Sequence, residues 1–152
     1  FPLDKLVQSF KYGHRLALAS YFGARLAALL ASGCADLIVP VPLHPLRLRA
    51  RGFNQALELA RPVSRAWRIP IDLRSCRRIR HTPAQADLPW RERAANVRGA
   101  FQCSADFTGK RVLLVDDVMT TGASLDELAR SVRLQGAEQV TLLVVARALP
   151  PA

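Results

Sequence analysis

The sequence predicts a single α/β domain, residues 1–152, with a twisted, mainly parallel sheet of five strands flanked by helices. Strand and helix patterns alternate along the chain, and this order places helices on both faces of a parallel sheet. The runs VLLV and VTLLVVA are apolar throughout, as expected for strands covered on both faces. A length of 152 residues also fits one domain of about 100–200 residues.

The N-terminal half combines helical spacing with one short strand. The run LALASYFGARLAALLASGCA has the apolar character of a signal peptide, but Arg25 interrupts it and its large apolar side chains recur at helical spacing. An apolar run ending near Pro40 predicts a strand, and the prolines and arginines after it predict a turn. The expected elements are helices at 3–10 and 14–31, a strand at 37–41, a turn at 42–52 and a helix at 54–67.

The C-terminal half contains the clearest strand, at 111–115, and a polar stretch too long for an ordinary connection. Gly136 ends the helix that follows this strand. The expected elements are strands at 69–73, 100–103, 111–115 and 139–146, a polar loop at 74–91 and a helix at 125–135.

The charge of the chain is high and uneven. The formal net charge is +10, and thirteen arginines but only four acids lie between Arg47 and Arg98. Such an excess predicts an anionic partner, whether a phosphorylated metabolite, a nucleic acid or a membrane surface. Arginine suits bidentate contact with phosphate. No run of about 20 apolar residues occurs, so no membrane span is expected.

The three cysteines, Cys34, Cys76 and Cys103, are far apart and form no CxxC pair. We therefore expect neither a disulfide framework nor a zinc site, and a reducing cytoplasm is the expected compartment.

The stretch RVLLVDDVMTTGAS, residues 111–124, concentrates polar groups at the end of the clearest strand. In open α/β sheets, ligands bind beyond the carboxyl ends of the strands. The side chains of Asp116 and Asp117 diverge if the extended path persists, so both could accept hydrogen bonds from one sugar diol. The turn from Thr120 to Ser124 opens a helix whose first N–H groups suit a phosphate. Together these features indicate a ribose 5′-phosphate site. Helix capping alone, by Ser124 with Glu127, is the competing interpretation.

The sequence lacks the motifs of other nucleotide-binding and hydrolytic enzymes. The pair Gly109–Lys110 lacks the first glycine of a P-loop, because Ser104 stands there, and Arg111 follows the lysine. No GxGxxG, HExxH or GxSxG pattern occurs.

The stretch VLLVDDVMTTGAS resembles, at every position, the phosphoribosyl-pyrophosphate (PRPP) motif of type I phosphoribosyltransferases. VPVPLHPLRLRARGFNQALELA, RRIRHTPAQADLPWRERAANVRGAF and LLVVAR are similar to the competence protein F (ComF) family, whose members carry this fold. Typical members begin with a four-cysteine zinc module that this sequence does not match, so no metal-finger role is carried over. The resemblance implies a type I phosphoribosyltransferase fold, with N-terminal helices and a small hood at 1–33 and a core at 34–152. The core includes a flexible loop at about 74–98.

The resemblance also assigns the parts of a site. Catalytic acids that hold the ribose 2′- and 3′-hydroxyls would be Asp116 and Asp117. The residues around the 5′-phosphate would be Thr120, Thr121, Gly122, Ala123 and Ser124. Pyrophosphate would be bound after the first sheet strand by Pro42, Leu43, His44, Arg47 and Arg51. The flexible lid would contribute Arg77, Arg78, Arg80 and His81. Without the family context, an ordinary proline turn explains the residues after the first strand equally well. For the lid, a solvated basic loop is the competing interpretation.

The implied reaction displaces pyrophosphate from C1 of PRPP through an oxocarbenium-like state, as in a pentosyl-transferring enzyme of nucleoside metabolism. Mg²⁺ would arrive with the substrate, since no protein ligand cluster is visible. The acceptor stays open, as does a homodimer. The alternative function is non-catalytic: ComF-like proteins are associated with DNA uptake, and the basic segment suits single-stranded DNA. Trp90 in the loop could stack on bases, but aromatics make up only 7% of the chain, so weak and salt-sensitive DNA binding is expected.

Overall fold

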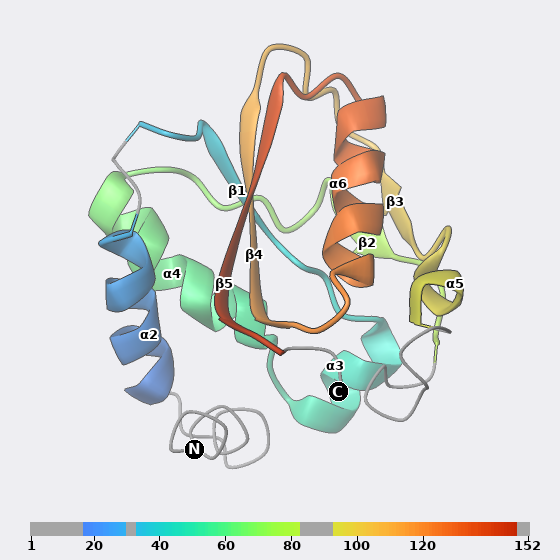
Figure 1. The fold of residues 1–152 in the computed structure, drawn as a ribbon, viewed down its shortest axis with the longest axis horizontal. Helices are drawn as coiled ribbons and strands as arrows, with labels where there is room; N and C mark the ends of the chain where they lie inside the picture. The colour runs from blue at the N-terminus through green and yellow to red at the C-terminus, as the bar shows by residue number, and fades with distance from the viewer. Residues whose placement is uncertain (1–16, 30–32, 83–92, 149–152) are drawn as a thin grey trace.

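The computed structural model describes residues 17–29, 33–82 and 93–148. A parallel sheet with the strand order β1-β4-β5 forms its centre (Figure 1). Its strands are β1 (Leu37–Pro40), β4 (Arg111–Met119) and β5 (Gln139–Arg147). The predicted α/β fold with a parallel sheet flanked by helices is confirmed.

The expected single sheet of five strands is wrong in detail. In the described residues the parallel sheet has three strands, and β2 (Cys76–Arg78) pairs with β3 (Phe101–Cys103) in a separate antiparallel ribbon. The strand expected at 69–73 contributes only one bridge, between Ile71 and Ile38. Proline at position 70 has no N–H to donate to a ladder, which limits pairing there.

The two faces of the sheet are covered by different elements. On one face, α2 (Ala17–Ala27) and α4 (Gln55–Trp67) pack over Leu113 and Val115. The opposite face, with Val112, is covered by α6 (Ala123–Leu134). Figure 1 shows α2 and α4 on one side of the sheet, and α6 with the β2–β3 ribbon on the other. Successive strand residues point to opposite faces, so β1 and the first part of β4 are buried on both sides, whereas β5 is largely half-buried.

The close approach of α2 to α4 depends on a glycine. A Cβ atom added to Gly23 would lie 2.3 Å from Cγ of Pro62, so only a hydrogen fits between the two helices. At the start of α4, Asn54 Oδ1 accepts a hydrogen bond from Ala56 N at 3.0 Å. This cap explains why the helix expected at 54–67 begins where it does.

The stretch expected as a turn at 42–52 contains a short helix, α3 (Pro45–Arg51). Proline occupies its first position, and Nδ1 of His44 accepts a hydrogen bond from Leu46 N at 3.3 Å. Gly52 ends the helix in the left-handed conformation, with φ +78°. These start and stop residues favour a helix over the predicted open turn.

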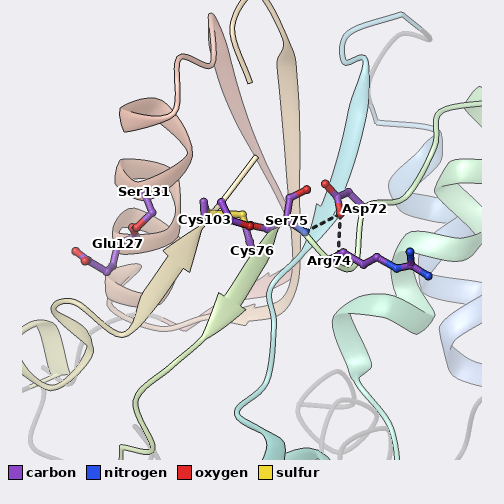
Figure 2. The surroundings of a disulfide bond; sticks show 8 residues. Asp72, Arg74, Ser75, Cys76, Cys103, Glu127 and Ser131 are labelled. Carbon is purple, nitrogen blue, oxygen red and sulfur yellow. Dashed lines mark hydrogen bonds between the residues drawn. A yellow bond between two sulfur atoms is a disulfide. The ribbon is translucent and has the colours of Figure 1, made fainter. Parts of the chain in front are cut away.

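The cysteine expectation is also corrected. Cys76 and Cys103 lie opposite each other in the β2–β3 ribbon, with Cα atoms 4.2 Å apart, and form a disulfide bond (Figure 2). Cys34 is the free cysteine. Strand pairing brings together two residues that are 27 positions apart, a relationship that cysteine spacing alone does not contain.

Several expectations fall outside the described residues. These are the helix at 3–10, most of the N-terminal hood at 1–33, and the part of the lid that contains Trp90. The short helix α5 (Arg93–Val97) resumes the described chain after the lid. Across the described ranges, each helix falls short of the length and apolarity that crossing a bilayer requires.

Candidate functional site

The segment after β4 forms a compact turn that leads directly into α6. Gly122 caps the helix in the left-handed conformation, with φ +83°. Its carbonyl oxygen accepts from Asp126 N at 2.8 Å, and the Thr121 hydroxyl oxygen accepts from Ala123 N at 3.2 Å. A pocket of about 30 Å³ lies here, lined by Asp116, Val118, Met119, Thr120, Gly122, Ala123, Ser124 and Leu125. Thus Asp116 and most of the predicted phosphate residues line one pocket. We call the turn of residues 120–124 the cradle.

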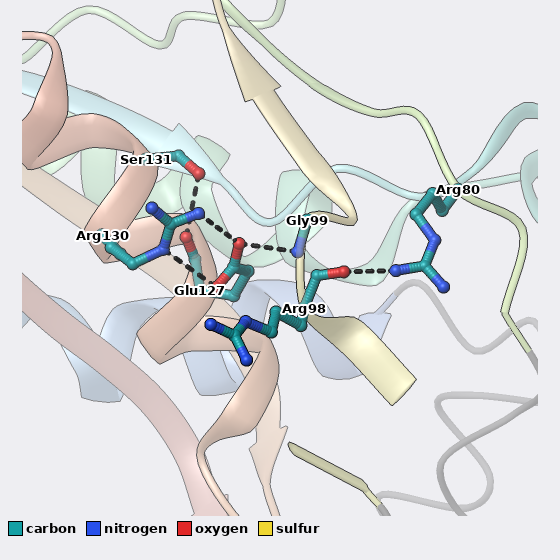
Figure 3. Close-up of polar contacts among 6 residues, drawn as sticks. All are labelled: Arg80, Arg98, Gly99, Glu127, Arg130 and Ser131. Carbon is teal, nitrogen blue, oxygen red and sulfur yellow. Dashed lines mark hydrogen bonds and ion pairs between the residues drawn. The ribbon is translucent and has the colours of Figure 1, made fainter. Parts of the chain in front are cut away.

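The capping interpretation of this turn is wrong. Gly122, not Ser124, is the N-cap, and the Thr121 hydroxyl accepts from the first N–H of the helix. Glu127 instead accepts a hydrogen bond from Gly99 N at 2.8 Å and pairs with Arg130 (Figure 3). Glu127 therefore fastens the end of the loop at 74–98 to α6.

The two acids occupy the last part of β4, which runs to Met119 rather than ending at the predicted position 115. Asp116 is half-buried and borders the cradle pocket, whereas Asp117 is only 8% exposed. As neighbours on a strand they point to opposite faces. Asp116 lies on the α6 side and Asp117 on the side of α2 and α4, which confirms the expected divergence and makes the two carboxylates unequal.

A group of basic side chains assembles beside the carboxyl end of β1. The Arg47 guanidinium donates to the Thr82 carbonyl oxygen at 2.9 Å, and Arg78 donates to the Thr82 hydroxyl at 2.7 Å. The imidazole rings of His44 and His81 lie 5.0 Å apart between centroids. Residues predicted for the pyrophosphate turn and for the lid are therefore in contact; we call His44, Arg47, Arg78 and His81 the basic cluster.

Arg78 is unusual because its charge is buried. The residue is 7% exposed, and its Nε has no hydrogen-bond partner within the described part of the chain. Burial, followed by the charge of Arg47, lowers the pKa of the Arg78 guanidinium, while the Asp116 carboxylate opposes this shift. An anion between Arg47 and Arg78 would relieve both costs.

His44 is held in a defined tautomer by its capping role. Because its Nδ1 accepts from Leu46 N, the proton of the neutral ring is assigned to Nε2, which is left as a donor. Burial lowers the pKa of His44, and the charges of His81, Arg78 and Arg47 lower it further. A neutral donor surrounded by cations can bind an anion and then take up a proton.

Three of the predicted arginines do not join the basic cluster. Arg51 donates to Gln55 Oε1 at 3.3 Å, toward α4. Arg77 is exposed, on the opposite side of β2 from Arg78. Arg80 donates to the carbonyl oxygen of Arg98 at the other end of the loop (Figure 3).

Sequence reasoning missed Thr82, the residue that joins Arg47 to Arg78. It also missed Phe101, whose ring lies 5.4 Å from the Arg78 guanidinium carbon. A threonine in a polar loop and an aromatic in a short strand carry no sequence signal for these roles. Their importance follows only from tertiary contacts.

The described residues 17–29, 33–82 and 93–148 contain no group of three or more His, Cys, Asp or Glu side chains that could hold a metal ion. Mg²⁺ in proteins commonly uses one or two carboxylates together with substrate phosphates. The half-buried carboxylate of Asp116 is a ligand of the kind that such an ion uses.

Comparison with known proteins finds one matching family and relatives that match most of the chain. Residues 24–149 match the family described as the phosphoribosyl transferase domain. The chain is 35% identical to competence protein F of Haemophilus influenzae over 157 residues, covering 97% of this chain and 69% of that protein. It is 34% identical to the DNA utilization protein YhgH of Escherichia coli strain K12 over 155 residues, covering 97% and 68%.

A solved structure supports the fold. Glutamine phosphoribosylpyrophosphate amidotransferase of Bacillus subtilis, complexed with ADP and GMP, superposes with a TM-score of 0.57 and 23% identity. The match covers 84% of this chain and 26% of that enzyme, so the chain corresponds to about a quarter of it.

Proposed function

Since the chain belongs to the phosphoribosyl transferase domain family and is a relative of competence protein F, we propose that it binds PRPP with Mg²⁺. In this proposal it transfers or releases the phosphoribosyl group with loss of pyrophosphate. One observation carries the proposal: Asp116 borders the cradle pocket and interacts electrostatically with Arg78, the buried arginine of the basic cluster. PRPP has the matching order of groups, with a 5′-phosphate, a ribose diol and a pyrophosphate.

The cradle takes the 5′-phosphate. The first turn of an α-helix has N–H groups without partners in the helix, and Gly122, in the left-handed conformation, lets the phosphate approach the backbone of the turn closely. Asp116 and Asp117 accept hydrogen bonds from the ribose hydroxyls, with Asp116 as the principal contact because it borders the pocket. A carboxylate oxygen is a strong acceptor for such hydroxyl groups.

The basic cluster takes the pyrophosphate. Arg47 and Arg78 supply positive charge, and Nε2 of His44 supplies a neutral donor. Mg²⁺ bound to the substrate would neutralise further charge on the leaving group. When the bond between C1 and the pyrophosphate oxygen breaks, pyrophosphate keeps the bonding electrons. The guanidinium groups stabilise that developing charge, and an acceptor nucleophile or water forms the new bond to C1.

Ligand-induced stabilisation tests the proposal. At a hundredfold excess over Kd, PRPP–Mg²⁺ should raise the free energy of unfolding by about 2.7 kcal/mol, or the melting temperature by roughly 5–10 °C at this size. An unchanged melting temperature at millimolar PRPP would reject it. A coupled assay for released pyrophosphate then separates turnover from binding alone.

A second candidate function is binding of single-stranded DNA. It is favoured by the names of two relatives, competence protein F and a DNA utilization protein, and by the arginine excess between Arg47 and Arg98. Exposed Arg77, Arg80 and Arg98 lie on the β2–β3 ribbon and the loop between its strands. A strand of phosphates following these side chains would reach the basic cluster.

A further inference from the structure

The disulfide bond lies on the strand that carries the buried arginine. Cys76 and Arg78 are two positions apart on β2, so their side chains point to the same side of the ribbon. Cys103 lies opposite Cys76, and Phe101 lies opposite Arg78. Both cysteines are buried, with 5% and 8% of their surface exposed. The disulfide bond therefore lies two residues before Arg78, on the same side of the strand.

The two strands of the ribbon are held unequally. Strand β3 packs against α6, whereas the principal neighbour of β2 is β3 itself. On its other side, β2 borders a cavity of about 670 Å³, lined in part by Cys76, Arg77 and Arg78. A ladder of three residues per strand is marginal without further packing. The disulfide is thus a main restraint on the position of β2.

Hydrogen bonds also hold both ends of β2, and Arg78 itself contacts Thr82 and the Phe101 ring. Before the strand, Asp72 Oδ1 accepts hydrogen bonds from Arg74 N at 2.8 Å and Ser75 N at 3.0 Å (Figure 2). After it, Ile79 N donates to the carbonyl oxygen of Ala100 at 2.8 Å. The hydrogen bonds at the two ends set the direction of β2 but do not bear on the Arg78 side chain directly.

The surroundings of the Arg78 side chain are unfavourable for a charged group. Burial and the charge of Arg47 both disfavour its ionised form, as the lowered pKa of Arg78 indicates. An arginine with a long, flexible side chain would move toward water if its strand were free to shift. A firmly held β2 keeps the guanidinium beside Arg47 and Thr82, where an anion can use it.

We propose that the Cys76–Cys103 disulfide positions Arg78 in the basic cluster, so that reduction of this bond weakens the binding of pyrophosphate and of ligands that contain it. The inference rests on the proposed function of that cluster. The reductant is a dithiol, which gives up two electrons and two protons and closes its own disulfide. Cys76 and Cys103 become two thiols, and the β2–β3 ladder keeps only its hydrogen bonds. The cradle is unaffected, because it is built on β4 and α6.

The test compares oxidised and dithiothreitol-reduced protein by calorimetric titration with pyrophosphate–Mg²⁺, well below both melting temperatures. Reduction should weaken pyrophosphate binding by about tenfold or more, the loss expected for a charge-assisted hydrogen bond. The affinity for ribose 5-phosphate should change by no more than about twofold, since its cradle keeps its contacts. The double variant Cys76→Ser/Cys103→Ser should behave like the reduced protein without any reductant. Cys34→Ser, which removes only the free thiol, should keep the full redox effect.

The variant Arg78→Gln separates positioning from general stabilisation. Its oxidised and reduced forms should bind pyrophosphate equally weakly, because the side chain that the disulfide positions is gone. A redox ratio that persists in Arg78→Gln would overturn the inference, as would equal affinities of oxidised and reduced wild type. If oxidised and reduced wild type bind equally, the inference fails but the proposed PRPP binding stands. If the oxidised protein binds neither PRPP nor pyrophosphate, the proposed function is overturned as well.

Discussion

The Arg47 guanidinium donates a hydrogen bond to the carbonyl oxygen of Thr82 at 2.9 Å, which joins the helix after β1 to the segment after β2. Arg78 donates to the hydroxyl of the same threonine at 2.7 Å. Two arginines from distant parts of the sequence are thereby held on one threonine, and Arg78 is within electrostatic reach of Asp116. The pyrophosphate end of the proposed site is an assembly of tertiary contacts, while the phosphate end is a local turn.

The two acids should respond differently to removal of their charge. Asp116→Asn should weaken ribose 5-phosphate binding by about tenfold or more, because a charge-assisted hydrogen bond contributes ~1.5–3 kcal/mol. Asp117→Asn should cost less affinity, because Asp117 is 8% exposed on the opposite face of β4. Calorimetric titration measures both, and circular dichroism melting establishes that each variant is folded. A larger loss in Asp117→Asn than in Asp116→Asn would reverse the assignment.

Gly122→Ala should distort the cradle. An added Cβ atom would lie 3.3 Å from Asp126 Oδ2, at a position whose φ of +83° disfavours any side chain. The strain should lower the free energy of unfolding by about 1–2 kcal/mol and weaken ribose 5-phosphate binding as the turn shifts. Gly109→Ala is the matched control, because Gly109 also has positive φ, +67°, but no atom within 4 Å of its Cβ position. Equal phosphate affinities of the two variants would count against the cradle.

Pyrophosphate binding should be coupled to proton uptake at His44. The pKa of His44 is lowered by burial and then by His81, Arg78 and Arg47, so the free ring is neutral at neutral pH. A bound anion offsets that positive charge and raises the pKa of His44, so affinity should increase as pH falls from neutral toward the free-state pKa. Calorimetry in two buffers of different ionisation enthalpy measures the protons taken up.

His44→Asn supplies the control for this coupling. Asparagine still caps α3 but does not titrate. Protons taken up by pyrophosphate itself are common to both proteins, so the difference in proton uptake between wild type and variant belongs to His44. Identical proton uptake by the two proteins would exclude His44 as the coupled group.

PRPP and single-stranded DNA should compete if the basic cluster serves both. Oligonucleotide affinity should then fall by ~0.7 log unit per log unit of salt for each phosphate engaged. PRPP should be less sensitive to salt, because Asp116 and the cradle add directed contacts. The assay is fluorescence anisotropy of a labelled oligonucleotide titrated with PRPP–Mg²⁺, with pyrophosphate–Mg²⁺ as the charge control. Tight DNA binding that PRPP leaves unchanged would place the DNA elsewhere.

Local sequence signals predicted β4, the turn after it and α6, because apolar runs, a glycine and helical spacing act over a few residues. The end of β4 was predicted at position 115, where the apolar run ends. The strand continues because β5 pairs alongside it, with Asp116 opposite Val144 and Val118 opposite Ala146. The cradle could therefore be predicted closely, whereas the length of its strand depended on a neighbour.

The basic cluster could be predicted only as two separate segments. The arginine excess indicated an anion site, but not that Arg78 is buried while Arg77 is exposed. That difference follows from pairing in the β2–β3 ribbon, as does the disulfide between Cys76 and Cys103. Antiparallel register between two three-residue strands leaves no periodic trace in a sequence.

The most direct test is whether one molecule of PRPP occupies the cradle and the basic cluster together. Calorimetric titration of the oxidised protein compares PRPP–Mg²⁺ with ribose 5-phosphate and with pyrophosphate–Mg²⁺. We expect one PRPP per chain, bound at least about tenfold more tightly than either part, because a single ligand that contacts both ends loses its translational freedom only once. Saturable PRPP binding that is no tighter than pyrophosphate alone, or no saturable heat at millimolar PRPP, would contradict a single composite site.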